Sequence, residues 1–307
     1  MKEEDIRKRA VVNRYLELVQ EDAARLFGDK SKFRKIDCPA CGSGDLNHEF
    51  EKFGFDYVEC TVCETLFANP RPESKELLKI YVDSPSTRFW VKDFFLPTAE
   101  ARREKIFRPR AQFIAGRFPE MKSGRLADIG AGFGLFLDEM KGLWPESELI
   151  AIEPSVDMAK ICREKGFAVQ ESAIEDIGLS VKFDLITAFE LFEHLHDPEG
   201  FVETVYDHLN PGGYFFLTTL NGLGFDIQIL WERSKSVYPP HHINFFNPHS
   251  IELMLKRNDF EIVEIATPGQ LDWDIIEGAS RQEGIDPGRF FSTVSSHGSD
   301  EDRKSVV

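Results

Sequence analysis

Three glycines at alternate positions follow an aspartate that ends an apolar run, a pattern suited to holding a cofactor. Asp128, Gly130, Gly132 and Gly134 lie within residues 125–136, RLADIGAGFGLF. Glycine is needed where the backbone takes a left-handed conformation or lies directly against a ligand. A dinucleotide fingerprint would need glycine at position 135, where the chain has leucine, and no Gly-Lys-Ser/Thr of a P-loop follows. The spacing therefore predicts a strand, a tight turn and a helix that together cradle a nucleoside cofactor.

A second acidic residue lies where the ribose of such a cofactor is expected. Residues 149–155, LIAIEPS, form a short apolar run that ends at Glu153, about 20 residues past the glycines. A carboxylate at a strand end can accept hydrogen bonds from both ribose hydroxyls. We therefore predict that Glu153 and the adjoining Pro154 contact the cofactor; a solvated strand-end glutamate is the alternative.

A further apolar run ends in several polar residues. Residues 182–198 predict a strand with Phe189, Glu190, Glu193 and His194 at its carboxyl end. Open α/β sheets bind ligands at the carboxyl ends of their strands, so we predict that Phe189 and Glu190 contact the cofactor. If the turn after this strand is helical, both glutamates and His194 share one face and could hold a divalent cation. Helix capping and loop bracing is the alternative.

The remaining elements follow from periodicity. Residues 167–177 predict a strand and its turn, residues 198–209 a helix stopped by Asn-Pro-Gly-Gly, residues 214–220 a strand, residues 248–257 a helix and residues 260–266 a strand that resumes the sheet. Strands alternating with helices predict an α/β fold with a parallel, doubly wound sheet.

Four cysteines form the second chemical constellation. Cys38 and Cys41 are followed, after eighteen residues, by Cys60 and Cys63. Two such pairs fit a tetrahedral zinc site, because each pair forms a knuckle and the intervening hairpin brings the knuckles together. Four thiolates close the coordination sphere, so the Zn²⁺ is expected to be structural; disulfides or redox pairs are the alternative.

The glycine pattern resembles motif I of the class I S-adenosylmethionine-dependent methyltransferases, D-x-G-x-G-x-G, at residues 128–134. The resemblance implies that the loop, with Ala131 and Phe133, lies under the methionyl and ribose parts of S-adenosylmethionine. It also implies that Asp128 lies near the methionine amino group, and that the turn with Ser172, Ala173 and Ile174 holds the adenine.

The chain as a whole resembles a bacterial methyltransferase group with an amino-terminal zinc-binding module, through CPACG, CTVCETLFANPRP, EHLHDP, NPGGYFFLTT and HHINFFNP in that order. The resemblance implies a Rossmann-like doubly wound sheet of the class I type, preceded by a small zinc-ribbon-like module and a helical connector. It further implies an O- or C-methyltransferase acting on a small molecule such as a sugar or sugar nucleotide. The seventh, antiparallel strand of such sheets has no counterpart after Ile276.

These anchors divide the chain into five parts: an amino-terminal helix (1–35, helical from Glu3 to Phe27), the zinc module (36–72), a helical connector or lid (73–121), the cofactor domain (122–275, with 221–247 as an acceptor-side insert) and a carboxyl-terminal tail (276–307) expected to be partly disordered.

Methyl transfer to a hydroxyl or carbon acid requires a base. His241 and His242 in the insert, and His194 after the fourth strand, are the candidates, because neutral imidazole accepts protons near pH 7. We favour the His241–His242 pair because the insert is expected to face the acceptor. A histidine that only braces a loop is the alternative.

Composition limits the partners. The chain of 307 residues is 42% hydrophobic and carries 37 Lys and Arg against 53 Asp and Glu, a net charge of −16. This disfavours nucleic acid as substrate. The arginines and lysine of residues 101–117, which include Arg108 and Arg110, suggest an anionic acceptor, with a solvated helix face as the alternative.

No stretch is long enough to span a membrane and no signal peptide is seen, so we expect a cytoplasmic protein. The oligomeric state stays open. A zinc-module RNA methyltransferase and a non-catalytic cofactor-binding interaction module are the alternative functions.

Overall fold

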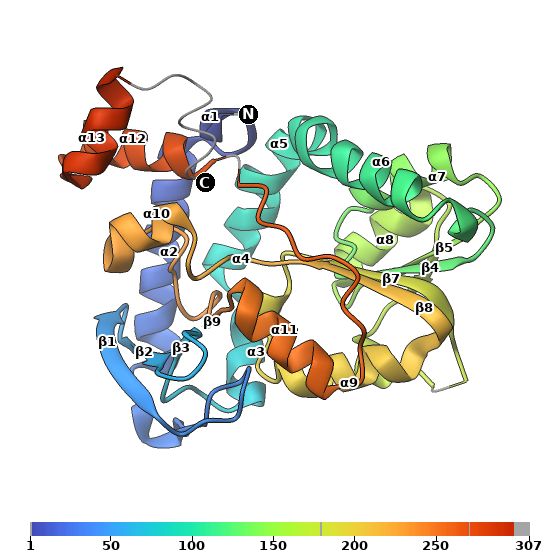
Figure 1. Ribbon diagram of the computed structural model, residues 1–307, viewed down its shortest axis with the longest axis horizontal. Coiled ribbons are helices and arrows are strands. Elements are labelled where there is room, and N and C mark those ends of the chain that lie inside the picture. Colours follow the sequence, from blue (N-terminus) through green and yellow to red (C-terminus); the bar gives the residue numbers. More distant parts are fainter. Residues whose placement is uncertain (1, 179, 270, 298–307) are drawn as a thin grey trace. The chain divides into compact units, whose positions relative to one another are not determined.

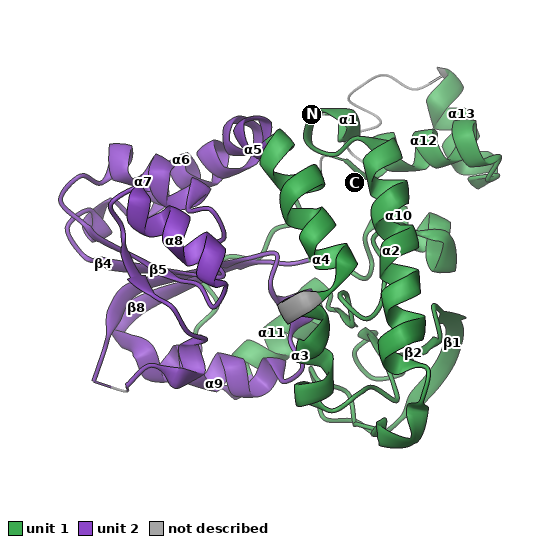
Figure 2. Ribbon diagram, turned by 180° about the vertical axis from the view of Figure 1, so that it is seen from behind, with its two compact units in different colours: residues 1–98, 220–256, 261–307 green, residues 99–219, 257–260 purple. Residues whose placement is uncertain are grey.

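A computed structural model describes residues 2–178, 180–269 and 271–297, which fall into two compact units (Figures 1 and 2). Unit 1 comprises residues 1–98, 220–256 and 261–307, and unit 2 comprises residues 99–219 and 257–260. No helix in the described part of the chain combines the length and apolar character needed to cross a membrane.

Unit 2 contains the predicted α/β sheet. Its strands are β4 (Arg125–Ile129), β5 (Glu148–Ile152), β6 (Ala168–Gln170), β7 (Phe183–Phe189) and β8 (Leu209–Thr218), and its helices include α6 (Arg108–Arg117), α7 (Leu135–Leu143), α8 (Val156–Glu164) and α9 (Pro198–His208). The order β6-β5-β4-β7-β8 with every neighbour parallel confirms the doubly wound sheet. Helices α6, α7 and α8 cover one face and α9 the other (Figure 1).

The Asn-Pro-Gly-Gly segment follows the end of α9 at His208, as predicted. It lies inside β8, however, so the predicted strand start at residue 214 was wrong. Strand β8 begins at Leu209, opposite Phe183, and an irregularity in the register follows before Tyr214 pairs with Leu185. At Gly213 a side chain would approach the Asp184 carbonyl oxygen within 3.0 Å. The glycine therefore allows the strand to continue through a bulge instead of ending.

The predicted strand at residues 260–266 was also wrong, because this segment has no regular structure and β8 remains the edge of the sheet. Its apolar residues do not alternate with buried faces: Val263 is 51% exposed and Ile265 is 39% exposed. A strand needs a neighbour as well as propensity, and here no pairing forms. Residues 271–297 are helical or irregular, so within the described tail no seventh strand is present.

Unit 1 consists of helices around a small antiparallel sheet. Its elements are α1 (Glu3–Ile6), α2 (Arg9–Phe27), β1 (Leu46–Lys52), β2 (Phe55–Cys60), β3 (Leu66–Ala68), α3 (Ser74–Asp83), α4 (Pro85–Phe89), α10 (Phe225–Leu230), β9 (Asn244–Phe245), α12 (Asp272–Glu283) and α13 (Gly288–His297), while α5 (Leu96–Arg102) and α11 (Pro248–Arg257) cross the unit boundary. Phe27, Phe55, Tyr57 and Phe245 are among the side chains of its core.

Strand β9 joins the sheet of the cysteine module, in the order β1-β2-β3-β9. The structure thus groups residues 220–256 with unit 1, whereas the sequence-based division counted residues 221–247 within the cofactor domain. Three short β strands bury little by themselves, so pairing with a distant strand extends the small sheet and its core.

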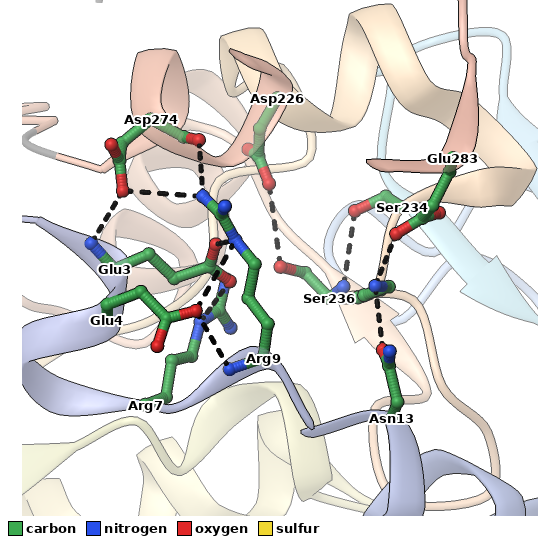
Figure 3. A network of polar contacts seen from close by, with 11 residues as sticks. Glu3, Glu4, Arg7, Arg9, Asn13, Asp226, Ser234, Ser236, Asp274 and Glu283 are labelled. Carbon is green, nitrogen blue, oxygen red and sulfur yellow. Dashed lines mark hydrogen bonds and ion pairs between the residues drawn. The ribbon is translucent and has the colours of Figure 1, made fainter. Parts of the chain in front are cut away.

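The amino terminus is two helices instead of the single one predicted, because Arg7 is extended between α1 and α2. Figure 3 shows the cause: Arg9 donates to the Glu3 carboxylate at 2.7 Å and to the Asp274 carbonyl at 3.0 Å, while the Glu3 amide donates to the Asp274 carboxylate at 2.7 Å. These hydrogen bonds connect α1 to α12. The tail is helical over Asp272–Glu283 and Gly288–His297, and residues 298–307 lie outside the described part.

Candidate functional site

The predicted glycine loop lies between β4 and α7 at the carboxyl end of the sheet. Gly130, Gly132 and Gly134 have φ angles of 70°, 55° and 67°, in the left-handed region that favours glycine. A side chain at Gly134 would also come within 3.2 Å of the Cys162 sulfur. The loop geometry therefore depends on glycine, as its spacing predicted. The Ala131 and Phe133 side chains are buried, so this stretch would present backbone to a ligand.

The two predicted acids lie beside this loop and are both buried, with Asp128 at 3% and Glu153 at 5% exposure. One oxygen of Glu153 accepts from the Gly132 amide and the other from the Ser155 amide, each at 2.8 Å. These bonds fix the carboxylate against the loop and leave further lone pairs on both oxygens. The fixed geometry fits a group that accepts hydrogen bonds from a diol.

The negative charge of Asp128 is not fully balanced by its neighbours. Burial raises its pKa to about 7 and Glu153 acts in the same direction, while the Thr187 hydroxyl and Arg110 oppose them. Thr187 donates to Asp128 at 2.7 Å, and its own side chain is fully buried. A carboxylate in this environment is stabilised by any cation placed beside it, because the interior screens charge poorly. An ammonium group is such a cation.

The adenine-side residues lie after β6. Ile174 begins a 3-10 turn and is 1% exposed, Ala173 is half-buried, and Pro154 is exposed after β5. Ile174 therefore belongs to the core beneath this edge of the sheet, and Ala173 and Pro154 are the residues with surface to offer a ligand. Their contact with a cofactor stays a prediction.

The carboxyl end of β7 is strained and charged. Glu190 has a φ of 51°, which is uncommon for a residue with a side chain. Its carboxylate accepts from Arg110 at 2.6 Å and from Thr218 at 2.8 Å. Burial would raise the pKa of Glu190, but Arg110 and Thr218 outweigh it and the net shift is downward. The Arg110 guanidinium also lies 5.2 Å from the centroid of the Phe189 ring.

Glu193 and His194 follow in a 3-10 turn, Phe192–His194, that leaves Glu190 outside it. The helical face that would gather both glutamates and the histidine is therefore absent, and this part of the cation hypothesis was wrong. Glu193 is 1% exposed and accepts from the Thr219 hydroxyl at 2.9 Å. Burial, reinforced by Glu190, raises its pKa to about 8, so it carries a proton at neutral pH.

Arg108 and Arg110, which the sequence groups together, have different partners in the structure. Arg110 was grouped with Arg108 as a contact for an anionic acceptor, but Arg108 pairs with Glu139 at 3.0 Å on α7, as Arg103 does at 2.6 Å. Arg110 pairs with Glu190, and its Nη1 is buried without a hydrogen-bond partner among the described residues. A buried, unsatisfied guanidinium donor is costly, and an anionic group of a ligand would satisfy it.

The four cysteines converge in unit 1. All four sulfurs lie within 4.8 Å of one another, with 3.5 Å between Cys38 and Cys63 and 3.5 Å between Cys41 and Cys60. Tetrahedral coordination at the Zn–S bond length of about 2.3 Å places sulfurs about 3.8 Å apart. The sulfurs are too far apart for disulfides, and the Cys38 thiol lowers the pKa of Cys63, which favours a thiolate there. The donor set thus fits Zn²⁺.

His241 and His242 belong to unit 1 and are 4% and 7% exposed. The Nδ1 of His242 lies 2.7 Å from the Ser236 carbonyl oxygen, and its ring contacts the Tyr238 ring in a tilted arrangement, with 3.8 Å between the centroids. A carbonyl can only accept, so Nδ1 carries the hydrogen and Nε2 keeps the lone pair in the neutral ring. That tautomer suits a base. The His241 ring packs among Tyr15, Tyr81 and Tyr238.

The sheet and its glycine loop lie within the part of the chain that matches a known protein family. A family model described as a methyltransferase domain matches residues 98–265. The ubiquinone biosynthesis O-methyltransferase of Xanthomonas euvesicatoria pv. vesicatoria is 31% identical over 171 residues, covering 51% of this chain and 70% of that protein. The enzyme of the same name from Xanthomonas oryzae pv. oryzae is 24% identical over 174 residues, with the same coverage.

Two solved structures are similar at a lower level. The plantazolicin methyltransferase in complex with SAH is 15% identical, covers 69% of this chain and 90% of its own, and has a TM-score of 0.49. A possible histamine N-methyltransferase from Thermotoga maritima is 24% identical, covers 56% and 82%, and has a TM-score of 0.44. At this level of similarity, the acceptors of these two proteins do not indicate the acceptor of this chain.

Proposed function

The chain belongs to the methyltransferase domain family, and we propose that it transfers a methyl group from S-adenosylmethionine to an oxygen or carbon of a small-molecule acceptor. The observation that carries this proposal is the glycine loop with two buried carboxylates, Asp128 and Glu153, beside it. The O-methyltransferase relatives favour oxygen as the accepting atom. A sugar or sugar nucleotide is our leading acceptor class.

Three residues beside the loop have charges or hydrogen-bonding atoms that S-adenosylmethionine could satisfy, and we propose that they hold it. Asp128 would pair with the α-ammonium group, Glu153 would accept from the ribose hydroxyls, and the unsatisfied Nη1 of Arg110 would donate to the methionyl carboxylate. Bound S-adenosylmethionine supplies an electrophilic methyl group on a sulfonium. The protein contributes alignment, because an in-line displacement requires the acceptor to be held along one axis.

A hydroxyl acceptor must lose its proton, and we propose His242 as the base. The Ser236 carbonyl holds its Nδ1 in the protonated form, so Nε2 is the atom that accepts the proton. Asp128 cannot take this role if it pairs with the cofactor, and Glu193 is protonated at neutral pH. His241 and His194 are the other candidates.

Zn²⁺ is proposed as a structural ion held by Cys38, Cys41, Cys60 and Cys63. Four thiolates leave no open coordination position for a substrate, so the ion would stabilise the small sheet of unit 1 and take no part in methyl transfer. Small modules of this kind gain folding free energy from the metal directly.

Calorimetric titration with S-adenosylmethionine and S-adenosylhomocysteine tests the cofactor assignment, with NAD as the control ligand and Gly132→Arg as the control variant. We expect micromolar binding of the first two, which the variant loses. Absence of binding by folded, zinc-loaded protein would refute the enzyme proposal and favour an interaction module.

A screen of sugar nucleotides and phenols for methyl acceptance then follows. His242→Ala should abolish turnover and leave cofactor affinity intact, whereas retained turnover excludes His242 as the base.

A further inference from the structure

The segment that carries His242 is built into the cysteine module. Strand β9 pairs with β3 through Phe245 with Leu66 and Asn244 with Phe67. The Ala68 amide donates to the Ile243 carbonyl at 2.9 Å. The histidine segment, residues 238–247, therefore contains β9, which is the fourth strand of the sheet that contains the Cys60 end of β2.

Two buried side chains attach this segment to the module. The hydroxyl of Tyr57, on β2, donates to the His242 carbonyl at 2.5 Å, and Arg71 donates to the Asn244 side-chain oxygen at 3.0 Å. Tyr57 and Asn244 are fully buried and Arg71 is 3% exposed. Buried polar atoms are costly to separate from their partners, so these contacts fix the backbone on both sides of Ile243.

Asn247 makes the contact that reaches the cysteines themselves. Its Nδ2 donates to the Cys63 carbonyl at 2.8 Å and to the Glu64 carbonyl at 3.1 Å. These two carbonyls belong to the second knuckle, in which the Glu64 amide donates to the Cys60 carbonyl at 2.9 Å and Glu64 has a φ of 57°. Asn247 is 2% exposed and its bond to the Cys63 carbonyl is buried, so water cannot readily replace that bond.

The side-chain oxygen of Asn247 forms a hydrogen bond to α11. Its Oδ1 accepts from the Ser250 amide at 2.9 Å, and the Ser250 hydroxyl accepts from the Asn247 amide at 2.9 Å. This reciprocal pair caps the amino end of α11. Asn247 ends the histidine segment, and its side chain hydrogen-bonds both to the knuckle and to the first turn of α11.

We propose that Asn247 is a positioning residue that makes the histidine segment depend on the metal-bound knuckle. The cysteine site would thus set the place of His242 from a distance, without contact between metal and substrate. The proposal rests on the assignment of His242 as the base for its effect on turnover. The coupling between knuckle and segment does not depend on that assignment.

The knuckle is strained at Glu64 and is closed by the two thiolates it would present to Zn²⁺. Backbone bonds hold the turn itself, with the Cys60 amide donating to the Thr65 carbonyl at 3.0 Å. Without the metal, the Cys60 and Cys63 sulfurs make only weak thiol interactions, such as that of Cys63 with Thr65 at 3.2 Å. Relaxation of the knuckle would displace the two carbonyls that Asn247 binds. The histidine segment would then lose its anchor at one end.

Hydrogen exchange of the full-length, zinc-loaded protein tests this coupling with two matched variants. Asn247→Ser removes the donor to the knuckle and keeps an oxygen that can cap α11. Ser250→Ala removes the capping hydroxyl and keeps the knuckle contact. We expect amide exchange across residues 242–247 to be faster by roughly tenfold in Asn247→Ser, the size of one or two buried hydrogen bonds. We expect Ser250→Ala to alter exchange only within α11.

Zinc content and cofactor affinity should stay at the wild-type level in both variants, and removing zinc from the wild type should accelerate exchange in the same six residues. Wild-type exchange across residues 242–247 in zinc-loaded Asn247→Ser would overturn the proposal. So would metal removal that leaves this segment protected.

Turnover separates this inference from the function it rests on. If Asn247→Ser loosens the segment, we expect a lower kcat, an unchanged KM for S-adenosylmethionine and an altered ¹⁵N signal of the His242 ring. A loosened segment with full kcat would support the coupling and reject His242 as the base. An unchanged segment with reduced kcat would reject the coupling and leave the base assignment standing.

Discussion

Replacement of Thr187 by valine should weaken cofactor binding at neutral pH through the charge of Asp128. The Thr187 hydroxyl donates to Asp128 at 2.7 Å, and both side chains are buried. Valine keeps the shape of threonine and removes the donor. The ionised carboxylate loses a stabilising partner, whereas its protonated form loses little, so the pKa of Asp128 must rise.

The size of the effect follows from the buried geometry. A hydrogen bond to a charged group contributes about 1.5–3 kcal/mol and one pKa unit corresponds to about 1.4 kcal/mol, so the pKa of Asp128 should move from about 7 to roughly 8 or 9. At pH 7 the ionised fraction falls from about one half to roughly one tenth or one hundredth. If the ionised form binds the α-ammonium group, affinity falls roughly 5- to 50-fold.

Titration calorimetry between pH 5.5 and 7.5 measures this directly. For the wild type, affinity should rise about tenfold per pH unit well below the pKa and level off above pH 7. The valine variant should still be rising at pH 7.5, Thr187→Ser should follow the wild type, and Asp128→Asn should bind weakly with a flat profile. A valine variant with wild-type affinity and the wild-type midpoint would refute the reasoning.

The remaining predictions concern the loop, the metal and the arginines. Gly134→Ala should destabilise unit 2 more than Gly132→Ala. Both glycines have positive φ, which costs about 1 kcal/mol each, but only at Gly134 would the new methyl group lie too close to a sulfur and a ring, at 3.2 and 3.3 Å. Equal unfolding midpoints would contradict this. Cys41→Ser should lower zinc from about one ion per chain to near zero after dialysis against a chelator, measured by mass spectrometry; full retention would argue for another ligand set. Arg110→Ala should weaken cofactor binding roughly tenfold. Arg108→Ala, which loses ion pairs with Glu139 and Glu104, should leave binding unchanged; equal effects would reject the distinction.

The parts of the site that sequence could predict depend on local pattern. The glycine loop, Glu153 and the four cysteines each arise from spacing within one or two neighbouring elements, and the structure places them in the expected loops and strand ends. Positive φ at three glycines and a carboxylate one strand away are consequences of a parallel βαβ unit. Such features can be predicted from a single sequence because the chemistry and the backbone conformation lie in the same short stretch.

The parts that sequence could not predict depend on pairing between distant segments. Strand β9 has two residues, too few for any periodicity, and exists because β3 offers it a partner. Arg110 finds Glu190 eighty residues away, so its role could not be separated from that of Arg108 on the same helix. Conversely, residues 260–266 carry strand propensity without a partner and stay irregular. In each case tertiary contacts overrode local preference.

The unfolding equilibrium connects the site to its ligand. The pKa of Asp128 is raised from about 3.9 in an unfolded chain to about 7 in the folded protein, so the stability it contributes is present at low pH and is lost as pH rises through about 7. Glu193, with its pKa raised to about 8, acts in the same direction. Replacement of Asp128 by asparagine should therefore stabilise the ligand-free protein at pH 8, by up to about 4 kcal/mol, in urea unfolding.

The same replacement should remove the gain in stability that S-adenosylmethionine gives the wild type, because the cation would have no carboxylate to meet. The strain at Glu190 and the unsatisfied nitrogen of Arg110 fit the same account, since each raises the free energy of the empty site. A ligand that carries both an ammonium and a carboxylate group would balance the charge of Asp128 and satisfy the buried donor of Arg110. An asparagine variant less stable than the wild type at pH 8 would show that Asp128 serves the fold, and the electrostatic argument for the cofactor would fail.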